Sequence, residues 1–183
     1  MPPKNKVTLP QLKDALTSAT GEVRYNAIVD FSHSDVTPEA IPTLLAALKD
    51  KSLAVVRCAA ECLGGLGDAA LSHGSPVLGC PQVMWELKQA ACQVDNVMYM
   101  PQAYTPCLAA MVKLDPKNEF IVGLIHDYIG MSNWTYLKAS LEALKTSGTP
   151  EALDLLTRAV AFWTPELDKK QQRIVQEIMK GKR

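Results

Sequence analysis

The chain has no excess of charge of either sign and no long apolar run. Lysine plus arginine and aspartate plus glutamate number 19 each among 183 residues, so no overall field attracts phosphate backbones or anionic lipids. No apolar stretch reaches the ~18 residues of a membrane-spanning helix, and the N-terminal MPPKNKVTLP lacks the apolar core of a signal peptide. We therefore expect a cytoplasmic protein that binds neither nucleic acid nor membrane.

Cysteines are few and follow no metal-binding pattern. The five are Cys58, Cys62, Cys80, Cys92 and Cys107, without a CxxC pair or the Cys/His spacing of zinc sites. Cys58 and Cys62 are one helical turn apart, which would let two thiolates meet one metal ion. They lie in an Ala/Leu segment, however, where free cysteine is usually a small buried hydrophobe. We interpret the cysteines as packing residues of a reducing compartment and expect no metal.

Catalytic motifs are also missing. The sequence has no GxSxG, HExxH or P-loop motif. Gly64-Gly65-Leu66-Gly67 resembles a phosphate-binding loop, but it follows a predicted helix rather than a strand, so we interpret it as the end of that helix. His126 and Asp127 point about 100° apart on a helix and do not pair readily as base and carboxylate. The sequence thus indicates no catalytic residue and no cofactor; it favours a non-enzymatic function but leaves enzymatic activity open.

What the sequence does contain is helical periodicity. Residues 41–67, IPTLLAALKDKSLAVVRCAAECLGGLG, hold two apolar stripes at helical spacing, separated by a polar turn at residues 49–52. The stripes consist of Leu44, Leu45 and Leu48 before the turn, and of Val55, Val56, Ala59, Ala60 and Leu63 after it. A single helical hairpin cannot bury both stripes, so we expect it to stack on further hairpins.

Degenerate copies of this hairpin recur along the chain. Val23-Arg24 precedes Val56-Arg57 by 33 residues, a period typical of helical repeats. Another first-helix pattern begins at Thr105-Pro106 and ends near Leu114, and we expect its second helix over residues 119–129. The predicted units are residues 8–34, 38–67, an irregular 82–130 and 133–161, followed by a capping helix over 165–180.

These units resemble HEAT repeats, in particular the short repeats of phycobilin lyase-like proteins. The resemblance is carried by Asp50, Val56, Arg57, Ala59, Ala60, Leu63 and Gly64, and near the end by Ala143, Leu144, Gly148, Thr149, Pro150, Glu151, Ala152 and Leu153. It implies an all-α fold, a right-handed α-solenoid of stacked helical hairpins that forms one domain over residues 1–183. In this family an aspartate at the turn and an arginine in the next helix form a ladder between repeats, which implies that role for Asp50, Arg24 and Arg57.

Residues 68–104 depart most from the repeat and form an irregular central insertion. The segment opens with DAALSHGSPVLGCP, continues with a predicted helix over 82–94, and ends in DNVMYMPQAY, where Pro101 prevents a regular helix. Two interpretations remain open. The apolar residues of the insertion either fold back as a plug on the core or form an epitope for a partner, for which methionine is well suited.

Two functions follow from these patterns. The first is a non-catalytic protein–protein interaction module, a scaffold or adaptor that binds a protein or peptide on its concave face or insertion. Its candidate contacts are Arg24, Arg57, Trp85, Met98, Tyr99 and Tyr104. For Arg24 and Arg57 a purely structural role is the alternative. The second function, implied by the resemblance alone, is a bilin lyase-like or chaperone-like protein that acts on a tetrapyrrole-bearing protein. The sequence does not distinguish a monomer from a homodimer.

Overall fold

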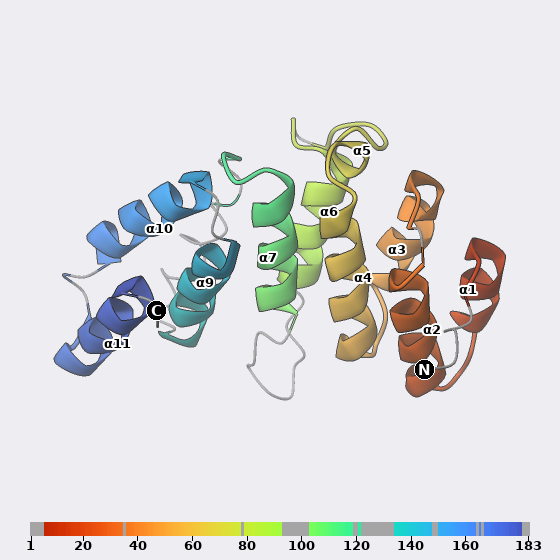
Figure 1. The fold of residues 1–183 in the computed structure, drawn as a ribbon, viewed down its shortest axis with the longest axis horizontal. Helices are drawn as coiled ribbons and strands as arrows, with labels where there is room; N and C mark the ends of the chain where they lie inside the picture. The colour runs from red at the N-terminus through yellow and green to blue at the C-terminus, as the bar shows by residue number, and fades with distance from the viewer. Residues whose placement is uncertain are drawn as a thin grey trace.

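The computed structural model describes residues 6–34, 36–77, 79–92, 103–118, 121, 134–147, 150–163, 165 and 167–180. In these residues every regular element is a helix, apart from one isolated β-bridge between Val77 and Cys80. The helices follow one another along the long axis of the molecule, with α1 at one end and α10 and α11 at the other (Figure 1). This arrangement confirms the predicted all-α solenoid.

Two hairpins make up the N-terminal part of the stack. Their helices are α1 (Leu9–Ala15) with α2 (Gly21–Ser32), and α3 (Ile41–Ala47) with α4 (Leu53–Gly65). A short 3₁₀ helix, η1 (Pro38–Ala40), precedes α3, and a short helix, α5 (Asp68–Leu71), follows α4. The remaining helices are α6 (Gln82–Ala91), α7 (Tyr104–Leu114), α9 (Trp134–Ser147), α10 (Pro150–Trp163) and α11 (Lys169–Lys180).

Local sequence signals place several helix ends. Pro10 and Pro42 lie in the first turns of α1 and α3, where a missing N–H does no harm. The Thr8 N–H also donates to Oε1 of Gln11 at 2.8 Å, which caps α1. Beyond α4, Gly67 has a φ of 55°, a left-handed conformation that favours glycine. The glycine-rich segment is therefore a helix end, as predicted.

Helix α7 occupies a different place from the one that its sequence pattern predicts. Thr105-Pro106 was expected to begin the first helix of a hairpin, but α7 packs against α4, α6 and α9. It therefore continues the row of α2 and α4, and α6 is its hairpin partner. The prediction was wrong because a proline near a helix start suits any helix and does not reveal its row. The predicted second helix over 119–129 lies outside the described residues, apart from Ile121.

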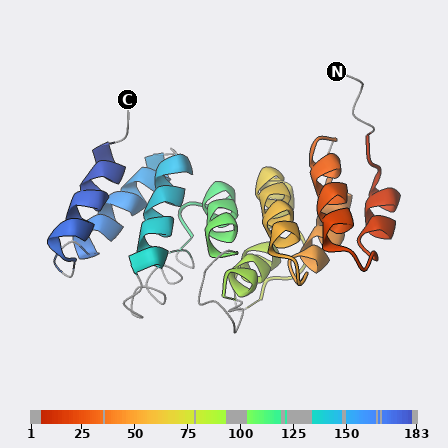
Figure 2. The same cartoon turned by 90° about the horizontal axis from the view of Figure 1, so that it is seen from below.

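The core runs the length of the stack, between the helices α2, α4 and α7 on one side and α3 and α6 on the other (Figure 2). Fully buried side chains along it include Leu12, Ile28, Leu44, Leu63, Met84 and Leu108. At the C-terminal end, α11 packs on α9 and buries Val175, whereas Lys169, Lys170 and Arg173 are exposed. None of the helices in the described segments combines the length and hydrophobicity that a membrane span requires.

Candidate binding groove between α2 and α4

A hollow of about 1100 Å³ lies between α2 and α4. Helix α2 and the residues after it line one wall with Tyr25, Val29, Ser32, His33, Ser34 and Val36. Helix α4 and its end line the other with Leu53, Ala54, Arg57, Cys58, Glu61, Cys62, Gly65 and Leu66. We call this hollow the α2–α4 groove.

The groove exists because the facing stripe of α4 is built from small residues. Ala54, Cys58, Cys62 and Gly65 are spaced by about one helical turn each and therefore share one face of the helix. Cys58 and Cys62 are buried, whereas Ala54 and Gly65 are exposed. The space that a leucine stripe would fill stays open to a ligand.

The ion pair between Arg57 and Glu61 lies on the α4 wall of the groove. Nε of Arg57 donates to Oε1 of Glu61, one turn further on, at 2.9 Å, and the two side chains are 66% and 54% exposed. The hydrogen bond to Glu61 raises the pKa of Arg57. Exposed pairs of this kind add only ~0.3–0.5 kcal/mol to stability, so both charges are free to exchange partners. Tyr25, 37% exposed, faces them from α2.

The thiols of the groove are protonated. Burial raises the pKa of Cys58, and burial followed by the proximity of Cys58 raises the pKa of Cys62 to about 12. A thiol reacts as a nucleophile or metal ligand through its thiolate. Within the described ranges, no three or more His, Cys, Asp or Glu side chains are grouped to hold a metal ion. The two cysteines therefore act here as small packing residues.

Arg24 and Arg57 follow valines at equivalent repeat positions, but the two arginines differ in burial and in their binding partners. Arg24 is buried, and its Nε and Nη2 donate to the two carboxylate oxygens of Asp50 at 2.6 and 2.8 Å. This is the ladder contact between repeats that the resemblance implied. Within the described part of the chain, Arg57 pairs with Glu61 on its own helix and makes no contact to the turn of another repeat. Arg24 is therefore structural, and Arg57 lies in the groove.

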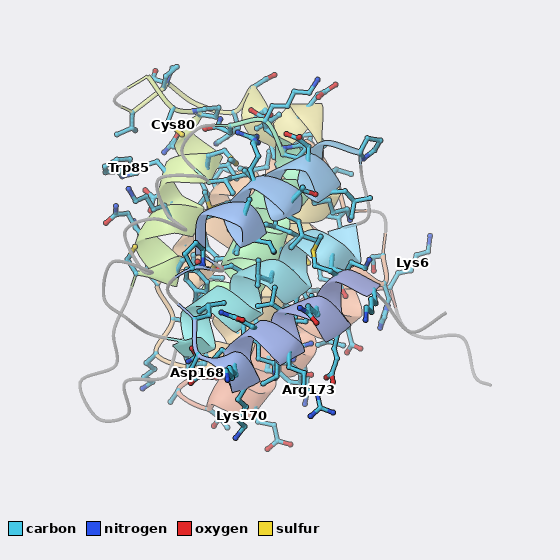
Figure 3. All side chains as sticks on the ribbon, turned by 90° about the vertical axis from the view of Figure 1, so that its left-hand side faces the viewer. Lys6, Cys80, Trp85, Asp168, Lys170 and Arg173 are labelled. Atoms are coloured by element: carbon cyan, nitrogen blue, oxygen red, sulfur yellow. The ribbon has the colours of Figure 1, made fainter. Side chains whose placement is uncertain are left out.

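The other predicted contact residues lie elsewhere. Tyr104 is fully buried, and its Oη lies 2.7 Å from Oγ of Ser140 on α9. Trp85 is half-buried on α6 and points to the edge of the molecule in Figure 3, which looks along the stack from its C-terminal end. Met98 and Tyr99 lie outside the described residues. Of the four predicted residues that the structure describes, only Arg57 lines the groove.

Sequence reasoning missed Tyr25, Val29 and Glu61. A signal for each was present: Tyr25 and Val29 are four residues apart on one helical stripe, and Glu61 follows Arg57 at the same spacing. What the pattern did not reveal is that these two stripes, on helices that begin 32 residues apart in the sequence, face each other across an open space.

Comparison with known proteins relates part of the chain to a protein family. Residues 9–73 match the family model for HEAT repeats, and this range contains both hairpins that build the groove. The match is to HEAT repeats in general and does not single out the phycobilin lyase-like type. No curated protein and no solved structure gives a significant match.

Proposed function

We propose that this chain, whose residues 9–73 are HEAT repeats, is a non-catalytic protein–protein interaction module. Its binding surface is the free face of α2, α4 and α7, centred on the α2–α4 groove. Stacked helical repeats present extended surfaces of this kind to other proteins. The observation that carries the proposal is an open groove of about 1100 Å³ on the two hairpins that match the family.

The chemistry of the groove supports protein binding. Its floor and walls include the half-buried apolar residues Val29, Leu53 and Leu66, which an apolar side chain of a partner would cover. Tyr25 and Arg57 are of the residue types that dominate binding energy at protein interfaces. The protonated thiols offer no nucleophile. These properties favour recognition over a covalent reaction.

A pull-down with matched variants tests this function. The groove variant carries Tyr25→Ser and Arg57→Ser. The control carries Arg158→Ser, because Arg158 on α10 is 64% exposed and binds Asp154 on its own helix at 2.9 Å, as Arg57 binds Glu61. We expect a protein from the native lysate to be captured by the wild type and the control but lost by the groove variant. Equal capture by all three would contradict the proposal.

Two further measurements in the same experiment test the insertion as a binding site and the bilin lyase-like function. A variant with Met98, Tyr99 and Met100 changed to serine tests whether the insertion is the epitope, and loss of capture by this variant alone would move the site there. The visible absorbance of the eluate tests the bilin lyase-like function. A coloured eluate would favour that alternative.

A further inference from the structure

We infer that the partner is a polypeptide segment that carries an apolar residue at one end and acidic residues along the rest. The apolar residue enters the α2–α4 groove, and the acidic residues lie over α7, α9 and α11. The inference rests on the proposed function and adds the chemistry of the partner. It is carried by the distribution of charge along the row of helices that contains the groove.

This row extends from the groove to the C-terminal end of the molecule. Helix α4 packs on α2 and α7, α7 packs on α9, and α9 packs on α11. The five helices follow one another in this order along the long axis in Figure 1. A polypeptide that lies across the row therefore meets them one after another.

The formal charge of these helices rises from one end of the row to the other. Helix α2 has a net charge of −1, from Glu22, Arg24 and Asp30, and the charges of Arg57 and Glu61 cancel on α4. Helices α7 and α9 each carry +1, and α11 carries +3. The charged residues of these three helices are Lys113 on α7, Lys138, Glu142 and Lys145 on α9, and Lys169, Lys170, Arg173, Glu177 and Lys180 on α11. Since the whole chain is neutral, the gradient is a property of this row.

Cations at the positive end of the row are accessible to a partner. Lys113 is exposed, the Arg173 side chain is 83% exposed, and Figure 3 shows Lys170 and Arg173 pointing outward from α11. Nε of Arg173 lies 3.9 Å from Oε1 of Glu177, and exposed pairs of this kind contribute little to stability. Arg173 can therefore exchange this partner for a carboxylate of a bound segment.

Two nearby charges serve the fold itself. Nζ of Lys145 donates to the Met179 carbonyl at 3.0 Å and so holds α11 on α9. Oδ1 of Asp168 accepts from the Gln171 N–H at 2.8 Å, which places this carboxylate at the N-terminus of α11. The basic residues named above, rather than Lys145, are therefore the contacts that we assign to the partner.

The groove end of the row disfavours a uniform polyanion. Glu61 lies on the groove wall, and Val29 and Leu66 beside it offer a half-buried apolar surface. A nucleic acid strand carries a negative charge at every nucleotide and would bring some of these charges against Glu61. A polypeptide can instead confine its acidic residues to α7, α9 and α11 and place an apolar side chain in the groove. The gradient thus favours a polypeptide of uneven charge.

The spacing of the helices gives the length of this segment. From α4 to α11 there are three steps between neighbouring helices, each ~8–10 Å. An extended polypeptide covers this distance of roughly 25–30 Å with about eight or nine residues, at ~3.3 Å per residue. The first acidic residue is expected about three residues from the apolar one, where the segment reaches α7.

Binding of synthetic peptides tests the inference. The probe is a fluorescein-labelled peptide with a leucine, a Gly-Ser-Gly spacer and a run of glutamates, made in both chain directions, and fluorescence anisotropy measures its Kd. We expect one direction to bind, and we expect serine for the leucine, or glutamine for the glutamates, to weaken binding about tenfold. Lys113→Glu with Arg173→Glu is expected to weaken binding by a similar factor, because like charges then oppose. This variant should instead bind a peptide with lysines in place of the glutamates.

The matched control is Lys13→Glu with Arg158→Glu, which changes the net charge equally on the exposed surface of α1 and α10, outside the row. We expect it to bind the acidic peptide like the wild type. Equal weakening by the control overturns the inference, as does a wild type that binds neither direction of the probe or binds an oligothymidylate of equal charge as tightly. If the probes fail while capture of a protein still depends on Tyr25 and Arg57, the inference is wrong and the proposed function stands.

Discussion

Arg24 binds both carboxylate oxygens of Asp50, 26 residues further along the chain, and so joins the first hairpin to the second. The side chains are only 5% and 12% exposed. Nη1 of Arg24 also donates to the Ser18 carbonyl at 2.7 Å, and Oδ1 of Asp50 accepts from the Ser52 N–H at 2.7 Å. Because these contacts come from two hairpins and their turns, they set the orientation of one hairpin on the next.

Removal of this arginine is expected to destabilise the protein strongly. Arg24→Ala leaves the largely buried carboxylate of Asp50 without its cation, and we expect the free energy of unfolding to fall by about 3 kcal/mol. Urea denaturation measures the change. Arg158→Ala, which breaks an exposed pair of similar length, is expected to change the free energy by less than about 0.5 kcal/mol. Equal losses for the two variants would contradict a special role for Arg24.

The same ion pair predicts a stability that falls in acid. Hydrogen bonds from Arg24 hold the pKa of Asp50 below its ordinary value of 3.8, against an opposing effect of burial. The contribution of Asp50 is therefore fully present well above pH 3.8 and is lost as the pH falls through the lower pKa of the folded state. The free energy of unfolding of the wild type should fall more steeply in this acidic range than that of Asp50→Asn. Parallel curves would show that Asp50 is not the group responsible.

Adjacent glycines in α4 are expected to respond in opposite ways to alanine. A Cβ on Gly64 would lie 3.0 Å from Cα and 3.1 Å from Cβ of Ala110 on α7, whereas a Cβ on Gly65 meets nothing within 4 Å. Alanine favours the helix by ~0.5–1 kcal/mol at either position, but at position 64 overpacking opposes this by ~1–3 kcal/mol. The midpoint temperature of thermal unfolding should therefore be higher for Gly65→Ala than for Gly64→Ala. The reverse order would mean that α7 can shift to accommodate the added methyl group at position 64 without a loss of stability.

The buried contact between Tyr104 and Ser140 is expected to couple α7 to α9. Both side chains are fully buried, and their oxygens lie 2.7 Å apart. Tyr104→Phe removes this hydrogen bond and should reduce the free energy of unfolding by about 1 kcal/mol. A double-mutant cycle with Ser140→Ala isolates the interaction, for which we expect a coupling of at least about 0.5 kcal/mol. A coupling of zero would show that the contact does not stabilise the fold.

The helices and their turns were predictable because their causes are local. The apolar stripes of residues 41–67, the prolines of the first turns and the glycines after α4 all act within a few residues. The Arg24–Asp50 contact was expected because the repeat period brings the arginine of one unit to the turn of the next. The capping helix was also found, although it begins at Lys169 rather than at residue 165.

By itself, the sequence determined an all-α stack of hairpins with a neutral surface, because periodicity and composition are properties of the chain alone. Only the tertiary structure decided that α7 continues the row of α2 and α4, and that Arg24 is buried whereas Arg57 is exposed. It likewise decided that the small residues of α4 face Tyr25 across an open groove. A periodic pattern shows which side of a helix is apolar, but the neighbour that covers each side depends on contacts between distant segments.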